Sequence, residues 1–206
     1  MRKVAESTVR RLSLYLRLLE EFEGQGMETV SSGALAARGG TTSAQVRKDL
    51  SFFGSFGKRG LGYPVPELAV QLREILGLKR RYRVALIGAG KIGSALVHYR
   101  GFRTRGFDIT AIFDIDPGKV GQDWNGQRIL DVAELEAELG RQPVEMAVLV
   151  TPADAAQPIA DRLVRLGVKA ILNFAPVQLS VPEDVAVKSV NLALELETLS
   201  YALTNR

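Results

Sequence analysis

The sequence predicts an α/β protein: a small helical domain with helix-turn-helix spacing, followed by a doubly wound parallel sheet. Two short helices joined by a Gly39-Gly40 turn predict the first domain. The sheet is predicted by a Gly88-x-Gly90-x-x-Gly93 pattern directly after an apolar run, and by apolar strands that alternate with helices beyond it. Because the glycine pattern begins only at residue 88, a separate module precedes it.

Length and charge agree with two domains. The chain has 206 residues, which is enough for two small hydrophobic cores. The formal charge is +6 for residues 1–81 and −2 for the remainder. A basic half favours a polyanionic partner, although a charge count also fits an ordinary solvated surface. We place the divisions at residues 1–80, 81–188 and 189–206.

The composition excludes several kinds of site. The chain has no cysteine, which excludes disulfides, thiolate zinc sites and cysteine redox switches. Any redox role must therefore use a bound cofactor. No stretch approaches the roughly 18 apolar residues of a membrane span, and no signal peptide is evident. We expect a cytoplasmic protein that contacts no membrane.

The first segment is predicted to hold three helices. The first begins at a Ser7 cap and ends near residue 24, the second spans about 31–38, and the third spans about 42–53. The apolar positions of the first helix recur every three or four residues, at Leu12, Leu16, Leu19 and Phe22. The last two helices have the spacing of a helix-turn-helix.

The third helix has one apolar face and one face suited to DNA. Val46, Leu50 and Phe53 share the apolar face. The opposite face holds Ala44, Lys48, Ser51 and Phe52, with Gln45 and Arg47 beside them. Arginine and lysine bind guanine edges or phosphates, and glutamine binds adenine. An ordinary charged surface helix is the alternative.

The glycine-rich segment 54–63 is predicted to be the wing of a winged helix. Phe56, Leu61 and Tyr63 would pack a small hairpin, with Lys58-Arg59 at its tip. Such a tip is slim enough for a minor groove. A phosphate-binding or catalytic loop is the alternative, but no helix start follows closely.

The second segment carries the glycine pattern in the context of a dinucleotide site. Gly88 allows a tight turn after the first strand, Gly90 lets the backbone approach a pyrophosphate, and Gly93 lets the next helix pack closely. Lys91 is a further candidate for a phosphate contact. Asp114 follows the next strand, 21 residues after Gly93, where a carboxylate binds the ribose diol and favours NAD over NADP.

Further strands are predicted at 146–150 and 170–172, with helices at about 131–139 and 153–166, which gives a Rossmann-like sheet. The carboxyl ends of these strands form the crevice where the nicotinamide end is expected. The residues at those ends are Thr151, Pro152, Asn173, Ala175 and Pro176.

Catalytic groups are sparse, so we expect no enzyme. His98 is the only histidine and follows the glycine pattern on a helix, where a surface or interface role is expected. No metal cluster and no nucleophile with its base is evident. A cofactor site without such chemistry suggests that the nucleotide is a signal.

The last predicted helix, residues 191–203, has two apolar stripes. One stripe holds Leu192, Leu196, Leu199 and Leu203, and the other holds Leu194 and Tyr201. Two stripes need two partners, so we expect this helix to lie between two subunits. Burial within its own domain is the alternative.

The segment Gln45–Tyr63, QVRKDLSFFGSFGKRGLGY, the glycine pattern and the string ILNFAP at 171–176 together closely resemble the Rex family of redox-sensing transcriptional repressors. The resemblance covers nearly the whole chain. It implies a homodimer with winged-helix DNA-binding domains, Rossmann-like cores and an exchanged C-terminal helix. It also implies double-stranded operator DNA of respiratory and fermentative genes as a partner, and NADH and NAD+ as regulatory ligands.

These considerations define two sets of candidate residues, with no catalytic residue and no metal site. The cofactor set is Gly88, Ala89, Gly90, Lys91, Ile92, Gly93, Tyr99, Asp114, Thr151, Pro152, Asn173, Ala175 and Pro176. The DNA set is Arg10, Arg11, Ser43, Ala44, Gln45, Arg47, Lys48, Ser51, Phe52, Lys58, Arg59, Gly60 and Tyr63.

Two positions differ from some relatives of the family. Asn191 stands where those relatives have an acidic residue that pairs with a basic residue of the first helix, here Arg17. Leu192 stands where they have an aromatic residue near the nicotinamide. An Asn191–Arg17 hydrogen bond would replace a charge pair, which affects the strength of switching.

NAD+ carries one more positive charge at the nicotinamide than NADH, so a dry pocket near Ala175 and Pro176 should favour NADH. For NADH to release DNA, it must prefer a dimer arrangement in which the two DNA-binding domains no longer match successive grooves of the DNA.

Two other functions fit the sequence. One is a small NAD-dependent dehydrogenase or coenzyme A-binding enzyme with an N-terminal dimerisation cap. The other is a DNA-binding protein that responds to no nucleotide.

Overall fold

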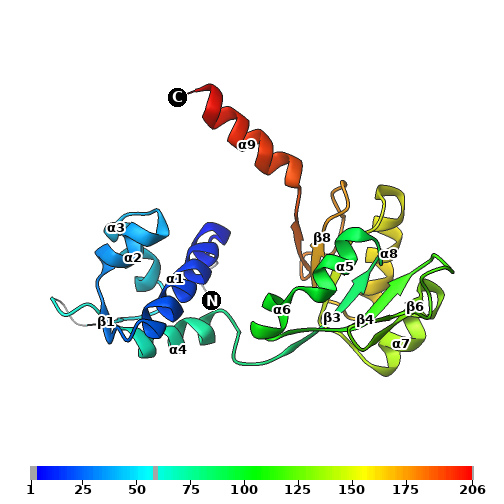
Figure 1. The fold of residues 1–206 in the computed structure, drawn as a ribbon, viewed down its shortest axis with the longest axis horizontal. Coiled ribbons are helices and arrows are strands. Elements are labelled where there is room, and N and C mark those ends of the chain that lie inside the picture. Colours follow the sequence, from blue (N-terminus) through cyan, green and yellow to red (C-terminus); the bar gives the residue numbers. More distant parts are fainter. Residues whose placement is uncertain (1–3, 58–59, 206) are drawn as a thin grey trace. The chain divides into compact units, whose positions relative to one another are not determined.

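The structure, a computed structural model, describes residues 4–57 and 60–205. The chain divides into two compact units, Met1–Arg80 and Arg81–Arg206 (Figure 1). The helix nearest the C-terminus, which we had set apart with residues 189–206, is grouped with the second unit.

The first unit is helical, with one pair of very short strands. In chain order its elements are α1 (Glu6–Gly24), β1 (Thr29–Val30), α2 (Ser32–Gly39), α3 (Ser43–Ser51), β2 (Tyr63–Pro64) and α4 (Val65–Ile75). The three expected helices are present. Helix α4 was not expected, although its buried residues follow helical spacing: Val65, Leu68, Ala69 and Leu72.

Side-chain caps set the starts of α2 and α3. Ser31 Oγ accepts a hydrogen bond from the Ala34 amide at 3.0 Å, and Thr42 Oγ1 accepts one from the Gln45 amide at 3.1 Å. Between the two helices the chain turns at Gly40, whose φ of 62° favours glycine. The expected Ser7 cap is wrong: α1 begins after Ala5, and Ser7 lies in its first turn.

One hydrophobic core joins the four helices of this unit. Its fully buried side chains include Leu12, Tyr15, Leu16 and Leu19 of α1, Leu35 of α2, Val46 and Leu50 of α3, and Leu68 and Leu72 of α4. The apolar stripe of each helix thus faces the same centre. Helix α3 is therefore fixed by its buried face and presents the other face to solvent.

The predicted wing forms only in part. Residues 54–57 and 60–62 contain no strand, although Gly62 forms a single bridge, and Tyr63–Pro64 pairs antiparallel with Thr29–Val30. The chain does fold back on itself, because a Cβ on Gly57 would overlap the carbonyl of Gly62. Phe56 packs against the core, whereas Leu61 is 70% exposed and does not pack as expected.

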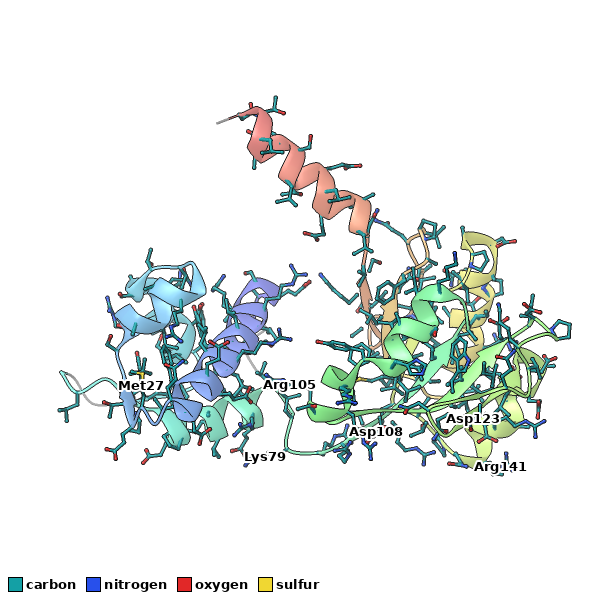
Figure 2. All side chains as sticks on the ribbon, viewed as in Figure 1. Met27, Lys79, Arg105, Asp108, Asp123 and Arg141 are labelled. Atoms are coloured by element: carbon teal, nitrogen blue, oxygen red, sulfur yellow. The ribbon has the colours of Figure 1, made fainter. Side chains whose placement is uncertain are left out.

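The second unit is a seven-stranded sheet in the order β5-β6-β4-β3-β7-β8-β9 (Figure 1). All neighbours are parallel except β5 and β6, so the expected parallel sheet carries one antiparallel edge strand. The strands are β3 (Tyr82–Ile87), β4 (Phe107–Asp114), β5 (Asp123–Trp124), β6 (Gln127–Asp131), β7 (Met146–Leu149), β8 (Ala170–Asn173) and β9 (Ala186–Ser189). Asp123, labelled in Figure 2, begins the edge strand.

Helices cover both faces of this sheet, as expected for a doubly wound fold. The helical elements are α5 (Lys91–His98), α6 (Arg100–Thr104), the 3-10 turn Val132–Glu134, α7 (Leu135–Arg141), α8 (Ala153–Arg165) and α9 (Leu192–Thr204). Alternate residues of β3 point to opposite faces. Ala85 and Ile87 share a core with α7 and α8, whereas Val84 and Leu86 share one with Val97 of α5.

Strands β5, β6 and β9 and helix α6 were not expected. Strand β9 has the residues Ala-Val-Lys-Ser and β6 has Gln-Arg-Ile-Leu-Asp, so neither shows a long apolar run. Pairing with neighbouring strands fixes β6 between β5 and β4 and β9 at the edge beside β8, which the local sequence does not reveal.

Helix α9 has no buried residue, and its side chains extend on all sides (Figure 2). Asn191 caps it, because its Oδ1 accepts from the amide of Ala193 at 3.0 Å. Among residues 4–57 and 60–205, none of the helices combines the length and apolar character that crossing a membrane requires.

Candidate nucleotide-binding loop and DNA-binding surface

The glycine loop 88–93 connects β3 to α5 with little free space around two of its glycines. Gly88 has a φ of 106°, and a Cβ there would lie 2.5 Å from the carbonyl oxygen of Val150. A Cβ on Gly93 would overlap the carbonyl oxygen of Gly88. Both positions therefore need glycine for the turn and for close packing of α5, as expected.

Gly90 faces open space, in contrast to the other two glycines. No atom lies within 4 Å of a Cβ built on it, and the neighbouring Lys91 and Ile92 are exposed. No side chain caps the start of α5 among the described residues. The amides of the first helical turn thus face an open surface, which suits a phosphate group.

Asp114 lies beside this loop at the carboxyl end of β4. Its Oδ2 accepts from the Ala89 amide at 2.6 Å, and its Oδ1 accepts from the Asp116 amide at 2.8 Å. Burial alone would raise the pKa of Asp114, but the Asp116 and Ala89 amides and Lys119 outweigh it and hold the pKa below its ordinary value. An ionised Asp114 therefore ties the glycine loop to the neighbouring strand.

The ends of β7 and β8 carry the other expected cofactor residues. The hydroxyl of Thr151 is buried and has no hydrogen-bond partner within the described part of the chain. A buried hydroxyl in this condition fits a polar ligand group, because leaving it unpaired costs free energy. Pro152 and Pro176 are exposed at the same edge of the sheet.

Asn173, at the end of β8, and Ala175, in the loop after it, are both buried. Asn173 is fully buried, donates to the carbonyl oxygen of Val177 at 2.8 Å, and accepts from the Ala175 amide at 2.9 Å. Ala175 is only 5% exposed. The Asn173 side chain therefore holds the loop after β8 in shape by bonding to the Ala175 amide and to the Val177 carbonyl oxygen.

Tyr99 is not brought to the glycine loop. It follows α5, whose eight residues separate it from Gly90 by about 12 Å along the helix. Its ring is 56% exposed and meets Phe102 edge to face.

A separate cavity of about 600 Å³ lies beside β4, β6 and α7, and none of the expected cofactor residues lines it.

The face of α3 that the sequence predicted to point outward is exposed to solvent. Ala44, Arg47, Lys48 and Ser51 are exposed, and Phe52 is 50% exposed, while Val46 and Leu50 are buried. Arg47 donates to Ser32 Oγ at 3.0 Å, which links α3 to α2. Arg10 is exposed on α1 near Glu6, and Gly60 is exposed, whereas Ser43 is half-buried. Lys58 and Arg59 lie outside the described residues.

Three members of the DNA set face inward to different degrees. Tyr63 is only 9% exposed and its side chain packs in the core of the unit. The Arg11 guanidinium binds Asp49 through Nε at 2.6 Å and Nη2 at 2.7 Å, so it is held within the unit and is not free for DNA. Gln45 is half-buried and donates to Asp49 at 2.8 Å.

Sequence reasoning assigned no role to Asp49, which the structure places beside Arg11 and Gln45. It is a fully buried carboxylate on a helix whose other charged residues are basic. Its spacing of four residues from Gln45 could have indicated a contact between the two side chains, because such side chains meet on one helix face.

His98 is exposed and contacts the carbonyl of Ser94. Within residues 4–57 and 60–205 no group of three or more acidic or histidine side chains could hold a metal ion.

Comparison with known proteins gives the same two parts. A family described as "Putative DNA-binding protein N-terminus" matches residues 3–51, and one described as "CoA binding domain" matches residues 79–177. A redox-sensing transcriptional repressor Rex of Syntrophomonas wolfei is 48% identical over 206 residues, which cover 99% of this chain and 98% of that protein.

Two solved structures of a protein called RSP are also similar. The complex of RSP with NAD+ and operator DNA has a TM-score of 0.93 and 41% identity, and the match covers 98% of this chain and 94% of that one. The complex of RSP with NADH has a TM-score of 0.90 and 40% identity, with 98% and 95% covered.

Proposed function

The chain belongs to the Rex family of redox-sensing transcriptional repressors, and we propose that it binds operator DNA and releases it when NADH binds. The observation that carries this proposal is the similar protein solved with NAD+ and operator DNA, which matches 98% of the chain. The basic outer face of α3 and the open glycine loop provide the two surfaces that such a switch needs.

The first unit is proposed to bind DNA through α3. Its exposed Arg47 and Lys48 supply positive charge, and the buried side of α3 fixes their direction. Phosphate contacts of this kind position a protein on DNA, and base contacts from the start of the recognition helix select the sequence. Residues 1–80 form the proposed DNA-binding domain.

The second unit is proposed to bind NADH and NAD+ at the glycine loop, with residues 81–188 as the nucleotide-binding domain. The open space at Gly90 and the free amides of α5 suit the pyrophosphate. The unpartnered Thr151 hydroxyl lies at the sheet edge where the nicotinamide end binds in this fold. NADH lacks the positive charge of the NAD+ ring and should bind more tightly in a dry pocket.

A homodimer is proposed to connect the two events. The exposed apolar side chains of α9, together with residues 189–206 as a dimerisation segment, fit an exchange of this helix between two copies. NADH can release DNA only if it binds one dimer arrangement better than the other. We place the protein in the cytoplasm, with genes of respiration and fermentation as targets and no catalytic role.

The test is a titration of labelled operator DNA with the protein by fluorescence anisotropy. We expect NADH to weaken binding and NAD+ at the same concentration to leave it unchanged. Gly90→Val is the matched variant, because its side chain enters open space and blocks the pyrophosphate without disturbing the fold. It should bind DNA but ignore NADH. Equal effects of the two nucleotides would refute the proposal.

The match of residues 79–177 to a coenzyme A-binding domain favours one second candidate, a coenzyme A-binding enzyme. Calorimetric titration with coenzyme A and NADH, followed by assays with thioester substrates, separates the two functions. Binding of coenzyme A with turnover would support the enzyme.

A further inference from the structure

The buried carboxylate of Asp49 collects donors from α1 and α3. It accepts hydrogen bonds from Arg11 Nε at 2.6 Å, Arg11 Nη2 at 2.7 Å, Gln45 Nε2 at 2.8 Å, Tyr15 Oη at 3.0 Å and Thr8 Oγ1 at 3.4 Å. Gln45 is the donor on α3 and belongs to the predicted DNA set, which also includes Arg11 of α1. The other donors come from α1 and hold the carboxylate in place.

The charge on Asp49 determines what it can bind. Burial alone would raise its pKa, but hydrogen bonds from Arg11, Gln45 and Tyr15 outweigh burial and keep the pKa below its ordinary value. An ionised carboxylate has acceptors and no donor. The Gln45 amide must therefore turn its NH₂ group toward Asp49, and its Oε1 must point away from it.

Gln45 stands where a recognition helix contacts base edges. It is the third residue of α3, and its backbone amide is held by the Thr42 cap at 3.1 Å. In helix-turn-helix proteins, the N-terminal residues of this helix reach the bases. With one N–H held by Asp49, the side chain retains an acceptor and one N–H, the pair that matches N6 and N7 of adenine.

Resting on the proposed DNA-binding function, we propose that Asp49 is a positioning residue that fixes the Gln45 amide so that Gln45 selects adenine in the operator. A glutamine without this restraint can rotate its amide by half a turn and offer its NH₂ group to guanine or thymine oxygens. Asp49 thus contributes to base selection without touching DNA.

The main test compares the wild-type chain with Asp49→Asn on a set of operators in which each base pair is changed in turn. Asparagine has nearly the same shape but can donate as well as accept, so it permits both orientations of the Gln45 amide. The wild type should prefer adenine at one position by about tenfold. In Asp49→Asn this preference should fall to about twofold at that position.

Tyr15→Phe is the matched control. It removes one hydrogen bond to Asp49 Oδ2 and leaves Oδ1, which holds Gln45. This variant should keep the wild-type base preference even if it unfolds more easily. Gln45→Ala tests the same proposal without altering the buried carboxylate, and it should lose the adenine preference at the same position.

The outcomes separate the proposal from its premise. Uniformly weaker binding of Asp49→Asn to all operators, with unchanged relative preferences, would overturn it. Retention of the adenine preference by Gln45→Ala would also overturn the proposal. This second test applies even if Asp49→Asn does not fold. Failure of the wild-type chain to bind any operator would instead refute the proposed function.

Discussion

Three glycines of one short loop face different surroundings, and these differences predict different mutational effects. Gly88 combines a φ of 106° with the nearby carbonyl of Val150. Gly93 has an ordinary φ, but its α-carbon faces the Gly88 carbonyl directly. Gly90 has neither restriction, so the fold does not require glycine there, and we propose that it leaves room for the nucleotide.

Gly93→Ala should therefore destabilise the second unit, whereas Gly90→Ala should not. The added methyl group at residue 93 must push α5 away from the strand, which we expect to cost about 1–3 kcal/mol of unfolding free energy. At residue 90 the methyl group meets open space. Urea denaturation of both variants without nucleotide checks this, and equal midpoints would contradict it.

Asp114 should make the stability of the second unit depend on pH. Its folded-state pKa lies below the ordinary value of 3.8, so its stabilising effect is present above that pH and is lost as the pH falls through the folded-state pKa. Asp114→Asn should thus be less stable than the wild type at pH 7, with a smaller difference at pH 3. Denaturation at several pH values measures it, and a constant difference would exclude this role.

At the scale of single elements, α3 should act through its exposed basic residues. Arg47→Ala or Lys48→Ala should weaken operator binding without changing NADH affinity. For Lys48→Ala, the slope of log affinity against log salt should become shallower by about one unit, because one phosphate contact is lost. Anisotropy titrations at several salt concentrations measure this slope.

Arg47 needs a control of its own, because it also donates to Ser32. Ser32→Ala removes that link and keeps the guanidinium. If Arg47 acts on DNA, Ser32→Ala should bind the operator nearly as well as the wild type. A loss equal to that of Arg47→Ala would show that the residue acts by joining α2 to α3.

Helix α9 should be a subunit contact. Leu196 is 67% exposed and Leu203 is 74% exposed on one stripe of the helix. A stripe of leucines exposed to water in this way indicates a surface that binds a partner. The double variant Leu196→Glu/Leu203→Glu should shift the protein from dimer to monomer in analytical ultracentrifugation. Glu197→Lys, at a position on the same helix that is already charged and lies off the Leu196–Leu203 stripe, is the control and should leave the dimer intact. A dimer in both variants would refute this contact.

At the scale of the whole molecule, the two units have separate cores and should respond separately to nucleotide. The cluster around Leu12 and Leu16 belongs to the first unit, and the two clusters of the sheet belong to the second. The only tryptophan, Trp124, lies in β5 and reports on the second unit.

Saturating NAD+ should therefore raise the thermal midpoint measured by Trp124 fluorescence, because a ligand that binds only the folded state stabilises it. At one hundred times its dissociation constant the gain is about 2.7 kcal/mol. Gly90→Val should show no such shift. A shift of the same size in that variant would place the nucleotide elsewhere.

Much of the molecule was predictable from local patterns. Periodic leucines predicted α1, the serine and threonine caps predicted α2 and α3, and the glycine spacing predicted the turn between β3 and α5. Helix α4 was overlooked, although its apolar residues follow helical spacing. Strands β6 and β9 were not predicted because their sequences contain few apolar residues. Such strands are stabilised by pairing with distant segments, which no local pattern records.

The sequence by itself determined the order of the two units, the glycine turn and the basic face of α3, because spacing and residue type decide these locally. Only the tertiary structure showed that Tyr63 and Asn173 are buried and that Arg11 binds Asp49. The Arg11–Asp49 contact joins residues 38 positions apart, which no local pattern records. Whether a polar side chain faces a ligand or its own core is settled by packing, since a buried charge is retained only with partners that the rest of the fold supplies.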